Sequence, residues 1–210
     1  MSTRVLRGVL LDLDETLYSR EAAFWDWIAS EAHAAGVATQ LDRERIALLD
    51  QRGRGDKRAL LEYLDVVFGW HEDEERRLHR FRLGIAAACR LQPGVRESLT
   101  RIGAQYRLGM VTNGSGAAQR AKLSALALQG SFDPLIISEE VGFRKPDPRV
   151  FALAIAGWEI PAGDVLFVGD DPVADIMGAA AAGMRALRVG HETGIPSILV
   201  LEAWLERARG

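Results

Sequence analysis

The stretch GVLLDLDETLY, residues 8–18, places three acidic side chains directly after an apolar run. Residues 9–11 are typical of a buried strand, and Asp12, Asp14 and Glu15 follow at its end. Like charges repel, and removing a carboxylate from water is costly. Acids at this place therefore indicate either an exposed strand end or a site that receives a positive group.

Length and composition are those of a globular protein with a sizeable core. The chain has 210 residues, of which 48% are hydrophobic and 26% are charged. This length predicts one domain, or a core with an insertion. The formal net charge of −3 provides no basic excess to neutralise a phosphate backbone. We therefore expect no nucleic-acid partner.

Cysteine usage and hydropathy exclude several classes of protein. A single cysteine, Cys89, cannot form an intramolecular disulfide. The first residues lack the pattern of a secretory signal, and no apolar run approaches the roughly 18–20 residues of a membrane span. We therefore expect a cytoplasmic protein with no membrane partner.

From residue 93 onward, short apolar runs alternate with segments of helical spacing. This alternation predicts parallel strands joined by right-handed helical crossovers. The strands are almost wholly apolar, as expected when helices cover both faces of a sheet. The predicted fold is a doubly wound α/β core. The expected strands are 108–111, 135–137, 165–168 and 186–189, and the expected helices are 115–128, 147–157, 172–182 and 197–208.

The segment between the first strand and residue 93 breaks this rhythm. It contains no strand-like run, and glycines separate four stretches of helical spacing, at 21–35, 41–50, 56–68 and 72–90. About 75 helical residues in place of one crossover helix indicate an inserted helical domain. We predict an α/β core formed by 1–18 and 92–210, and an inserted cap formed by 19–91.

Polar side chains follow each of the first four strands of the predicted core. In an open parallel sheet, ligands bind beyond the carboxyl ends of the strands. Two acid pairs, a hydroxyl, an amide and a lysine at such ends amount to a candidate site. The residues are Asp12 and Asp14 after the first strand, Thr112 and Asn113 after the second, Lys145 in the loop after the third, and Asp170 and Asp171 after the fourth.

These residue types fit the binding of a metal and a phosphate. Clustered carboxylates repel unless a cation joins them, and hard oxygen ligands suit Mg²⁺. The turn TNGSG at 112–116 opens a helix, and its free N–H groups and the helix dipole would favour an anion. Lys145 supplies a positive charge for a phosphoryl oxygen.

The paired aspartates then have separate chemical tasks. Aspartate is a competent phosphoryl acceptor, so Asp12 can attack phosphorus. Asp14 can protonate the departing oxygen and later activate water. The predicted partner is a small phosphorylated metabolite, and the predicted cofactor is Mg²⁺.

Four ordered segments resemble the motifs of the haloacid dehalogenase superfamily, in the subfamily with a helical cap inserted after the first motif. The likeness extends over essentially the whole core, whereas the cap resembles the family only in its place and helicity. The segments are DLDETL at 12–17, VTNG at 111–114, RKPDP around Lys145 at 144–148, and GDDPVAD at 169–175.

The resemblance implies a role for each residue of the site. Asp12 would be the nucleophile and Asp14 the general acid and base, while Thr112 and Lys145 would bind the phosphoryl group. It also implies a strand order of 3-2-1-4-5, which brings the first and fourth strands together. The implied metal ligands are Asp12, the backbone carbonyl of Asp14, and Asp170, with Asp171 a direct or water-mediated ligand, and Asp175 would orient Lys145.

One position departs from the family pattern. The residue after the second aspartate is most often glycine in the family's phosphatases, and here it is Glu15. We interpret Glu15 as a solvated or capping side chain, although a third carboxylate could also alter selectivity.

Other readings remain open at this stage. A phosphomutase of the same family would use the same groups with a different cap. The family's dehalogenases need no metal and generally lack the second aspartate and the acid pair of the last motif. Response-regulator receivers, which accept phosphate without being hydrolases, lack the large insertion after the first strand. The substrate's identity and the oligomeric state are not determined by the sequence.

Overall fold

The structure is a computed structural model that describes residues 5–190, 194 and 196–207. The other residues of the predicted core, 1–4, 191–193, 195 and 208–210, lie outside the described part. Packing divides the chain into two compact units: Met1–Ser19 with Arg90–Gly210, and Arg20–Cys89. No helix among the described residues is long and apolar enough to cross a membrane.

The first unit is built on a parallel five-stranded sheet. Its order is β3-β2-β1-β4-β5, which confirms the doubly wound fold and the strand order that the family resemblance implied. The central strand β1 is buried along its whole length, as an all-apolar strand between two layers should be. The strands are β1 (Gly8–Leu11), β2 (Arg107–Thr112), β3 (Leu135–Ile137), β4 (Val165–Gly169) and β5 (Arg185–Arg188).

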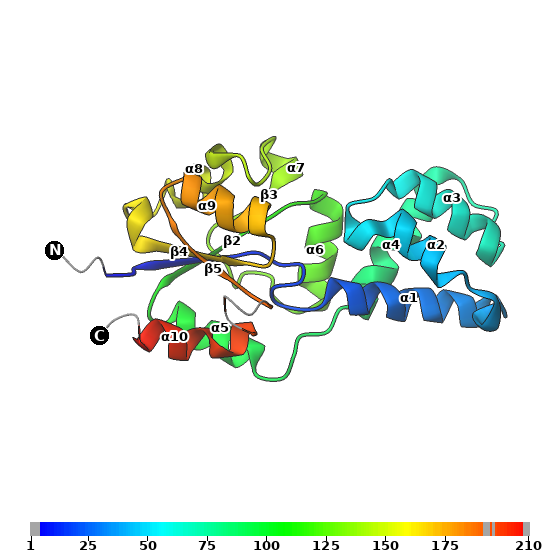
Figure 1. Ribbon diagram of the computed structural model, residues 1–210, viewed down its shortest axis with the longest axis horizontal. Helices are drawn as coiled ribbons and strands as arrows, with labels where there is room; N and C mark the ends of the chain where they lie inside the picture. Colours follow the sequence, from blue (N-terminus) through cyan, green and yellow to red (C-terminus); the bar gives the residue numbers. More distant parts are fainter. Residues whose placement is uncertain (1–4, 191–193, 195, 208–210) are drawn as a thin grey trace. The chain divides into compact units, whose positions relative to one another are not determined.

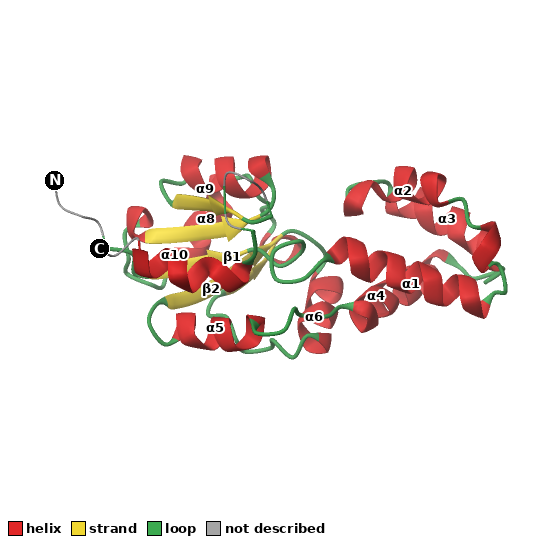
Figure 2. Ribbon diagram, turned by 60° about the horizontal axis from the view of Figure 1, so that its bottom comes forward, coloured by secondary structure: helices red, strands yellow, loops and turns green. Residues whose placement is uncertain are grey.

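Helices cover both faces of this sheet. Figures 1 and 2 show α8 and α9 on one face and α5 and α10 on the other. Phe151 of α8 packs edge-on against Phe167 of β4, and the two ring centroids are 5.1 Å apart. The helices of this unit are α5 (Val95–Gly103), α6 (Gly116–Ala125), α7 (Ser138–Val141), α8 (Pro148–Ile155), α9 (Gly178–Ala181) and α10 (Leu201–Arg207), with the short turns η3 (Ala162–Asp164) and η5 (Ile198–Val200).

Two segments that were each predicted to be one α-helix are divided between two kinds of helix in the structure. The segment 172–182 begins as a π-helical turn, η4 (Pro172–Met177), and only then continues as α9. Asp171 caps this turn by accepting hydrogen bonds from the N–H groups of Val173 and Ala174. The segment 197–208 is divided between η5 and α10. Helices α5 and α7 were not among the elements expected from the sequence.

The second unit is the helical insert between β1 and β2, as predicted. Three of its four α-helices begin at an aspartate whose side chain accepts a backbone N–H, which is the usual N-cap arrangement. Its interior holds an aromatic cluster in which Trp27 contacts Phe81 and Trp70. The helices are α1 (Arg20–Ala34), α2 (Arg43–Asp50), α3 (Lys57–Phe68) and α4 (Glu74–Ala88), with the short turns η1 (Ala38–Gln40) and η2 (Gln51–Gly53).

A buried ion pair joins two helices of the insert. Arg20 of α1 donates to both carboxylate oxygens of Asp50, and each side chain is at most 7% exposed. Lys57 adds a second cation to Asp50 at 3.3 Å. Arg58, the next residue, pairs with Glu62 of α3. Two of the basic side chains in segment 51–58 therefore form ion pairs within the insert.

Candidate functional site

The site begins where β1 ends. The backbone N–H of Asp12 donates to the carbonyl of Val168 at 2.9 Å, so the β1–β4 ladder continues into the first acidic residue. This hydrogen bond holds Asp12 at the carboxyl end of the central strand. Its side chain is 9% exposed, which is unusual for an aspartate without a partner.

Lys145 supplies that partner and joins two acids. Its Nζ lies 2.6 Å from Oδ1 of Asp12 and 2.7 Å from Oδ1 of Asp175. Burial alone would lower the pKa of this lysine, but the two carboxylates raise it above its usual value. Lys145 is therefore a fixed positive charge next to Asp12.

The loop that carries Lys145 is held by Asn113. The Asn113 amide accepts from the backbone N–H of Lys145 at 2.9 Å and donates to its carbonyl at 3.0 Å. This pair of hydrogen bonds ties the end of β2 to the lysine loop. The structure therefore places the Asn113 side chain on protein backbone, where it positions Lys145.

Three carboxylates form a group that could hold a metal ion. Ligand atoms of Asp12, Asp170 and Asp175 all lie within 4.8 Å of one another. Burial raises the pKa of Asp12 to about 8; the Lys145 ammonium opposes this rise, whereas Asp175 and Asp14 add to it. Burial, with Asp175 and Asp171 nearby, likewise raises the pKa of Asp170 to about 6. A bound cation would relieve this repulsion and favour the ionised form of Asp12.

The remaining acids of the last motif are held by local hydrogen bonds. Oδ1 of Asp171 accepts from two N–H groups of η4, at 2.8 and 2.9 Å. Oδ2 of Asp175 accepts from the N–H of Asp171 at 3.0 Å. Gly169 leaves room for this arrangement, because a Cβ there would lie 2.3 Å from Oδ2 of Asp175. Asp171 thus caps the turn, while Asp175 approaches both Lys145 and the acid cluster.

The turn after β2 differs from one expectation. The N–H of Gly114 donates to the Ser138 hydroxyl at 3.0 Å, and the N–H of Gly116 donates to Glu139 at 2.8 Å. These two groups were expected to be free for an anion, and that expectation was wrong for them. Thr112 ends β2 with a buried side chain whose Oγ1 accepts from Gln119 at 2.5 Å.

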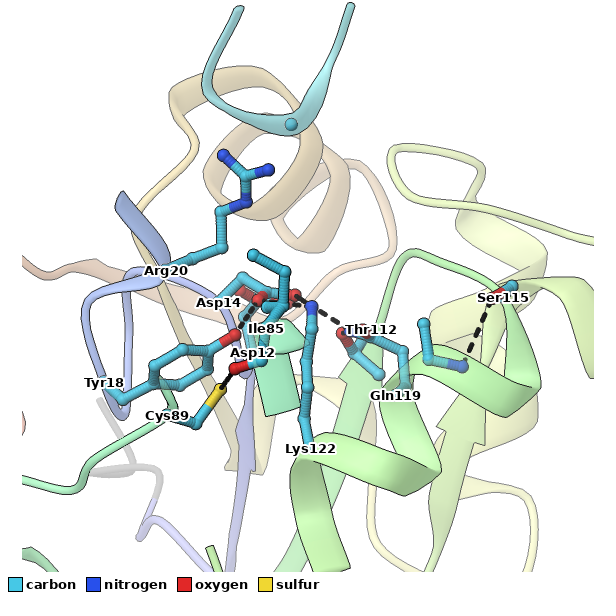
Figure 3. A network of polar contacts seen from close by, with 12 residues as sticks. Asp12, Asp14, Tyr18, Arg20, Ile85, Cys89, Thr112, Ser115, Gln119 and Lys122 are labelled. Atoms are coloured by element: carbon cyan, nitrogen blue, oxygen red, sulfur yellow. Dashed lines mark hydrogen bonds and ion pairs between the residues drawn. The ribbon is translucent and has the colours of Figure 1, made fainter. Parts of the chain in front are cut away.

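Asp14 lies in a network of three donors, which Figure 3 shows. Its carboxylate accepts from Lys122 at 2.7 and 3.0 Å, from Gln119 at 2.9 Å and from the Tyr18 hydroxyl. Burial by itself would raise the pKa of Asp14, but the Lys122 ammonium and the three donors lower it below its usual value. In the protein without substrate, these contacts therefore favour the ionised form of Asp14.

Glu15 lies in a backbone conformation that favours glycine. Glu15 has a φ of 58°, in the left-handed region that glycine adopts without strain. Its side chain accepts a long hydrogen bond, 3.5 Å, from the Ser19 hydroxyl. The turn that Glu15 opens brings Tyr18 back onto Asp14, since these two residues form an isolated β-bridge.

Sequence reasoning missed the three side chains that surround Asp14. Gln119 and Lys122 stand three residues apart on α6 and so share one helix face. Because α6 begins four residues after Thr112, this face could have been predicted to turn toward the strand ends. Tyr18 is four residues from Asp14, but nothing in the sequence marks the turn that joins them.

A hollow of about 930 Å³ lies within the helical insert, apart from the residues described above. Acidic and basic side chains of α4 form much of its lining, together with Glu31 of α1. None of the acids or phosphate-binding candidates predicted from the sequence lines it.

The amino-acid sequence is similar to those of known hydrolases. A family model described as a haloacid dehalogenase-like hydrolase matches residues 6–183. The chain is 32% identical to phosphoserine phosphatase of Thermus thermophilus over 188 residues, which cover 81% of this chain and 70% of that protein. It is 30% identical to glyceraldehyde 3-phosphate phosphatase of Methanothermobacter thermautotrophicus over 207 residues, 90% of this chain and 87% of that protein.

Solved structures resemble the fold over nearly the whole chain. The putative HAD-hydrolase YfnB of Bacillus subtilis, determined bound to magnesium, has a TM-score of 0.77 at 21% identity and covers 97% of this chain and 99% of its own. A HAD phosphatase of Thermococcus onnurineus has a TM-score of 0.69 at 25% identity and covers 98% of this chain and 100% of its own.

Proposed function

The chain belongs to the family of haloacid dehalogenase-like hydrolases, and from that premise we propose that it is a Mg²⁺-dependent phosphomonoesterase. It would hydrolyse a small phosphorylated metabolite through an aspartyl-phosphate on Asp12. The observation that carries this proposal is the contact of Lys145 with Asp12, beside the carboxylates of Asp170 and Asp175. A nucleophile, a fixed cation and a metal-binding group then occupy one place.

The acid cluster fits a divalent cation. Asp12, Asp170 and the backbone carbonyl of Asp14 would hold Mg²⁺, with Asp171 as a direct or water-mediated ligand. Mg²⁺ is bound by few carboxylates and retains waters and substrate phosphate oxygens, so this donor set is suitable. When bound, the ion would neutralise charge on the phosphoryl group and on the carboxylates. Asp175 would keep Lys145 in place, as its 2.7 Å contact supports.

The reaction would proceed in two balanced steps. In the first, a carboxylate oxygen of Asp12 forms a bond to phosphorus as the ester P–O bond breaks, and Asp14 gives its proton to the departing oxygen. In the second, Asp14 takes a proton from water as the water oxygen bonds to phosphorus and the Asp12–phosphorus bond breaks. Inorganic phosphate leaves, and both aspartates return to their starting state.

Other side chains would hold the phosphoryl oxygens. Lys145 offers a charged N–H donor, and Thr112 offers a hydroxyl from the adjacent strand end. Asn113 and Gly114 would contribute through the turn that carries Thr112, although the Asn113 amide itself is bound to the lysine loop.

Two relatives support a small substrate. The two relatives compared over most of their length are phosphatases of phosphoserine and of glyceraldehyde 3-phosphate, both small metabolites. We propose a substrate of that size, such as a sugar phosphate, a phosphorylated acid or a nucleotide.

A panel assay tests the proposal. Phosphate release from small phosphorylated metabolites is measured with Mg²⁺, with a chelator, and with Asp12→Asn. We expect turnover of at least one ester with Mg²⁺, and loss of it in the other two conditions. Undiminished turnover by Asp12→Asn or in the chelator would contradict the mechanism, and inactivity on every ester would contradict the function.

A further inference from the structure

The donors around Asp14 form an arrangement that the general mechanism does not require. Four hydrogen bonds from three side chains converge on one carboxylate, and both of its oxygens are used (Figure 3). Oδ1 accepts from Tyr18 and Lys122, and Oδ2 accepts from Gln119 and Lys122. An aspartate side chain has two free torsions, and this many donors fixes both of them.

The pair formed by Lys122 and Asp14 differs from an ordinary surface ion pair. The Lys122 side chain is 12% exposed and the Asp14 side chain 27%, so water screens the pair less than it screens an exposed one. On the same helix, Arg120 pairs with Glu140 at 2.7 Å with a 58% exposed side chain. The Lys122 side chain is thus largely shielded from water where it contacts Asp14, which lies 108 positions away in the sequence.

Gln119 links this carboxylate to the neighbouring strand end. Its Nε2 lies 2.9 Å from Oδ2 of Asp14 and 2.5 Å from Oγ1 of Thr112. The side chain is buried, and Gly114 is close enough that a Cβ there would meet Gln119 at 3.0 Å. Gln119 therefore fixes the distance between the proposed proton carrier and the proposed phosphate-binding hydroxyl.

We infer that Lys122, with Gln119 and Tyr18, positions the Asp14 carboxyl for proton transfer. This inference rests on the proposed function, in which the proton of Asp14 moves to the ester oxygen as that oxygen leaves phosphorus. Because Lys122 contacts both oxygens of Asp14, it can still donate to one of them while the other carries the proton. Lys122 is thus a positioning residue that acts through Asp14.

Leaving-group dependence distinguishes positioning from a general structural effect. A poor leaving group needs its proton as the P–O bond breaks, whereas a good one leaves with little help. Phenyl phosphate and p-nitrophenyl phosphate are similar in shape, but nitrophenol is a far stronger acid than phenol. A residue that positions the proton donor should therefore affect the phenyl ester more.

The experiment compares Lys122→Met with Arg120→Met, which removes an exposed cation from the same helix. kcat/KM is measured with Mg²⁺ for both esters. Since general acid catalysis contributes about 10²–10⁴-fold, we expect Lys122→Met to lose on the order of 10²-fold on the phenyl ester and less than about 10-fold on the nitrophenyl ester. Arg120→Met should stay within about 2-fold on both, as a surface substitution does.

Two further variants keep the inference falsifiable if Lys122→Met folds poorly. Tyr18→Phe removes only a hydroxyl, and it should shift the leaving-group dependence in the same direction by a smaller factor. Lys122→Arg keeps a donor cation, and it should recover part of the loss on the phenyl ester.

The outcomes separate the two proposals. Equal losses on the two esters, or no loss from Lys122→Met, would overturn the positioning role while Mg²⁺-dependent turnover by the wild type still supports the function. A wild-type protein that hydrolyses neither these esters nor any of the metabolite panel would overturn both.

Discussion

Removing one acid from the metal-binding group should stabilise the protein without metal. The folded environment raises the pKa of Asp170 from 3.8 to about 6. A difference of about two pKa units corresponds to about 3 kcal/mol at 1.36 kcal/mol per unit. Because Asp170 is only half-buried, solvent screening reduces this to about 1–2 kcal/mol. Asp170→Asn should therefore raise Tm in a chelator by about 2–8 °C near pH 7.5, since 1 kcal/mol shifts the Tm of a protein of this size by about 2–4 °C.

The pH dependence of this gain has a definite sign. Well above pH 6, the carboxyl of Asp170 is ionised in both the folded and the unfolded protein. The wild type then carries the full destabilisation that corresponds to the raised pKa of the folded state. As the pH falls from about 6 to about 4, the folded protein takes up a proton before the unfolded chain does, so the wild type regains stability. The advantage of Asp170→Asn should consequently disappear near pH 4.

Added Mg²⁺ should reverse the order of the two proteins. A ligand at 100 times its Kd stabilises the folded state by about 2.7 kcal/mol. The wild type should gain about this much, while Asp170→Asn gains little because it lacks a ligand. Glu206→Gln, which removes an exposed acid from α10, serves as the control and should behave like the wild type. A lower Tm for Asp170→Asn in the chelator, or an equal gain from Mg²⁺ in both proteins, would refute the reasoning.

Three further predictions concern the packing around the site and the insert. Asp50→Asn leaves the buried Arg20 without its anionic partner and should destabilise the insert by about 3–5 kcal/mol, measured by urea unfolding; a loss below about 1 kcal/mol would contradict it. Because Arg20 and Lys57 lower the pKa of Asp50, the wild type should lose this stability as the pH falls through about 4 and below, whereas the variant should show no such loss; unfolding free energies that stay a constant distance apart across this pH range would refute this. Gly169→Ala should displace Asp175 and lower kcat at least about 10-fold, whereas Gly157→Ala, which has open space around it, should leave activity unchanged; equal activities would rule the displacement out.

The fold could be predicted from the sequence because β1 to β4 contain short apolar runs, each ending in or followed by a polar residue. Leu135–Ile137 agrees with its predicted bounds, and the other strands differ by a residue or two at their ends. The π-helical form of 172–177 could not be predicted, because the apolar and alanine-rich pattern there is that of an ordinary helix. Its start depends on a local cap by Asp171, whose side chain had been interpreted only as a metal ligand.

The site could be predicted in part. Asp12, Thr112 and Asp170 stand at or directly after strand ends, Lys145 lies in the loop after a strand, and strand ends meet at one edge of a parallel sheet. The partners of Asp14 were not predicted, because Gln119 and Lys122 lie more than 100 residues away in the sequence. The occupied N–H groups after Thr112 were missed because their acceptors, Ser138 and Glu139, belong to α7, a helix that was not predicted from the sequence.

The most direct test of the proposed mechanism is whether a phosphoryl group becomes attached to Asp12. Asp14→Asn lacks the base that would activate water, so the aspartyl-phosphate should accumulate in this variant. The protein is mixed with p-nitrophenyl phosphate and Mg²⁺, quenched in acid and digested, and the peptides are measured by mass spectrometry. We predict one phosphoryl group on the peptide that contains Asp12, and none in the double variant Asp12→Asn, Asp14→Asn or in a chelator. A phosphoryl group on another residue, or unmodified Asp12 in the Asp14→Asn variant when the wild type turns the ester over, would contradict the mechanism.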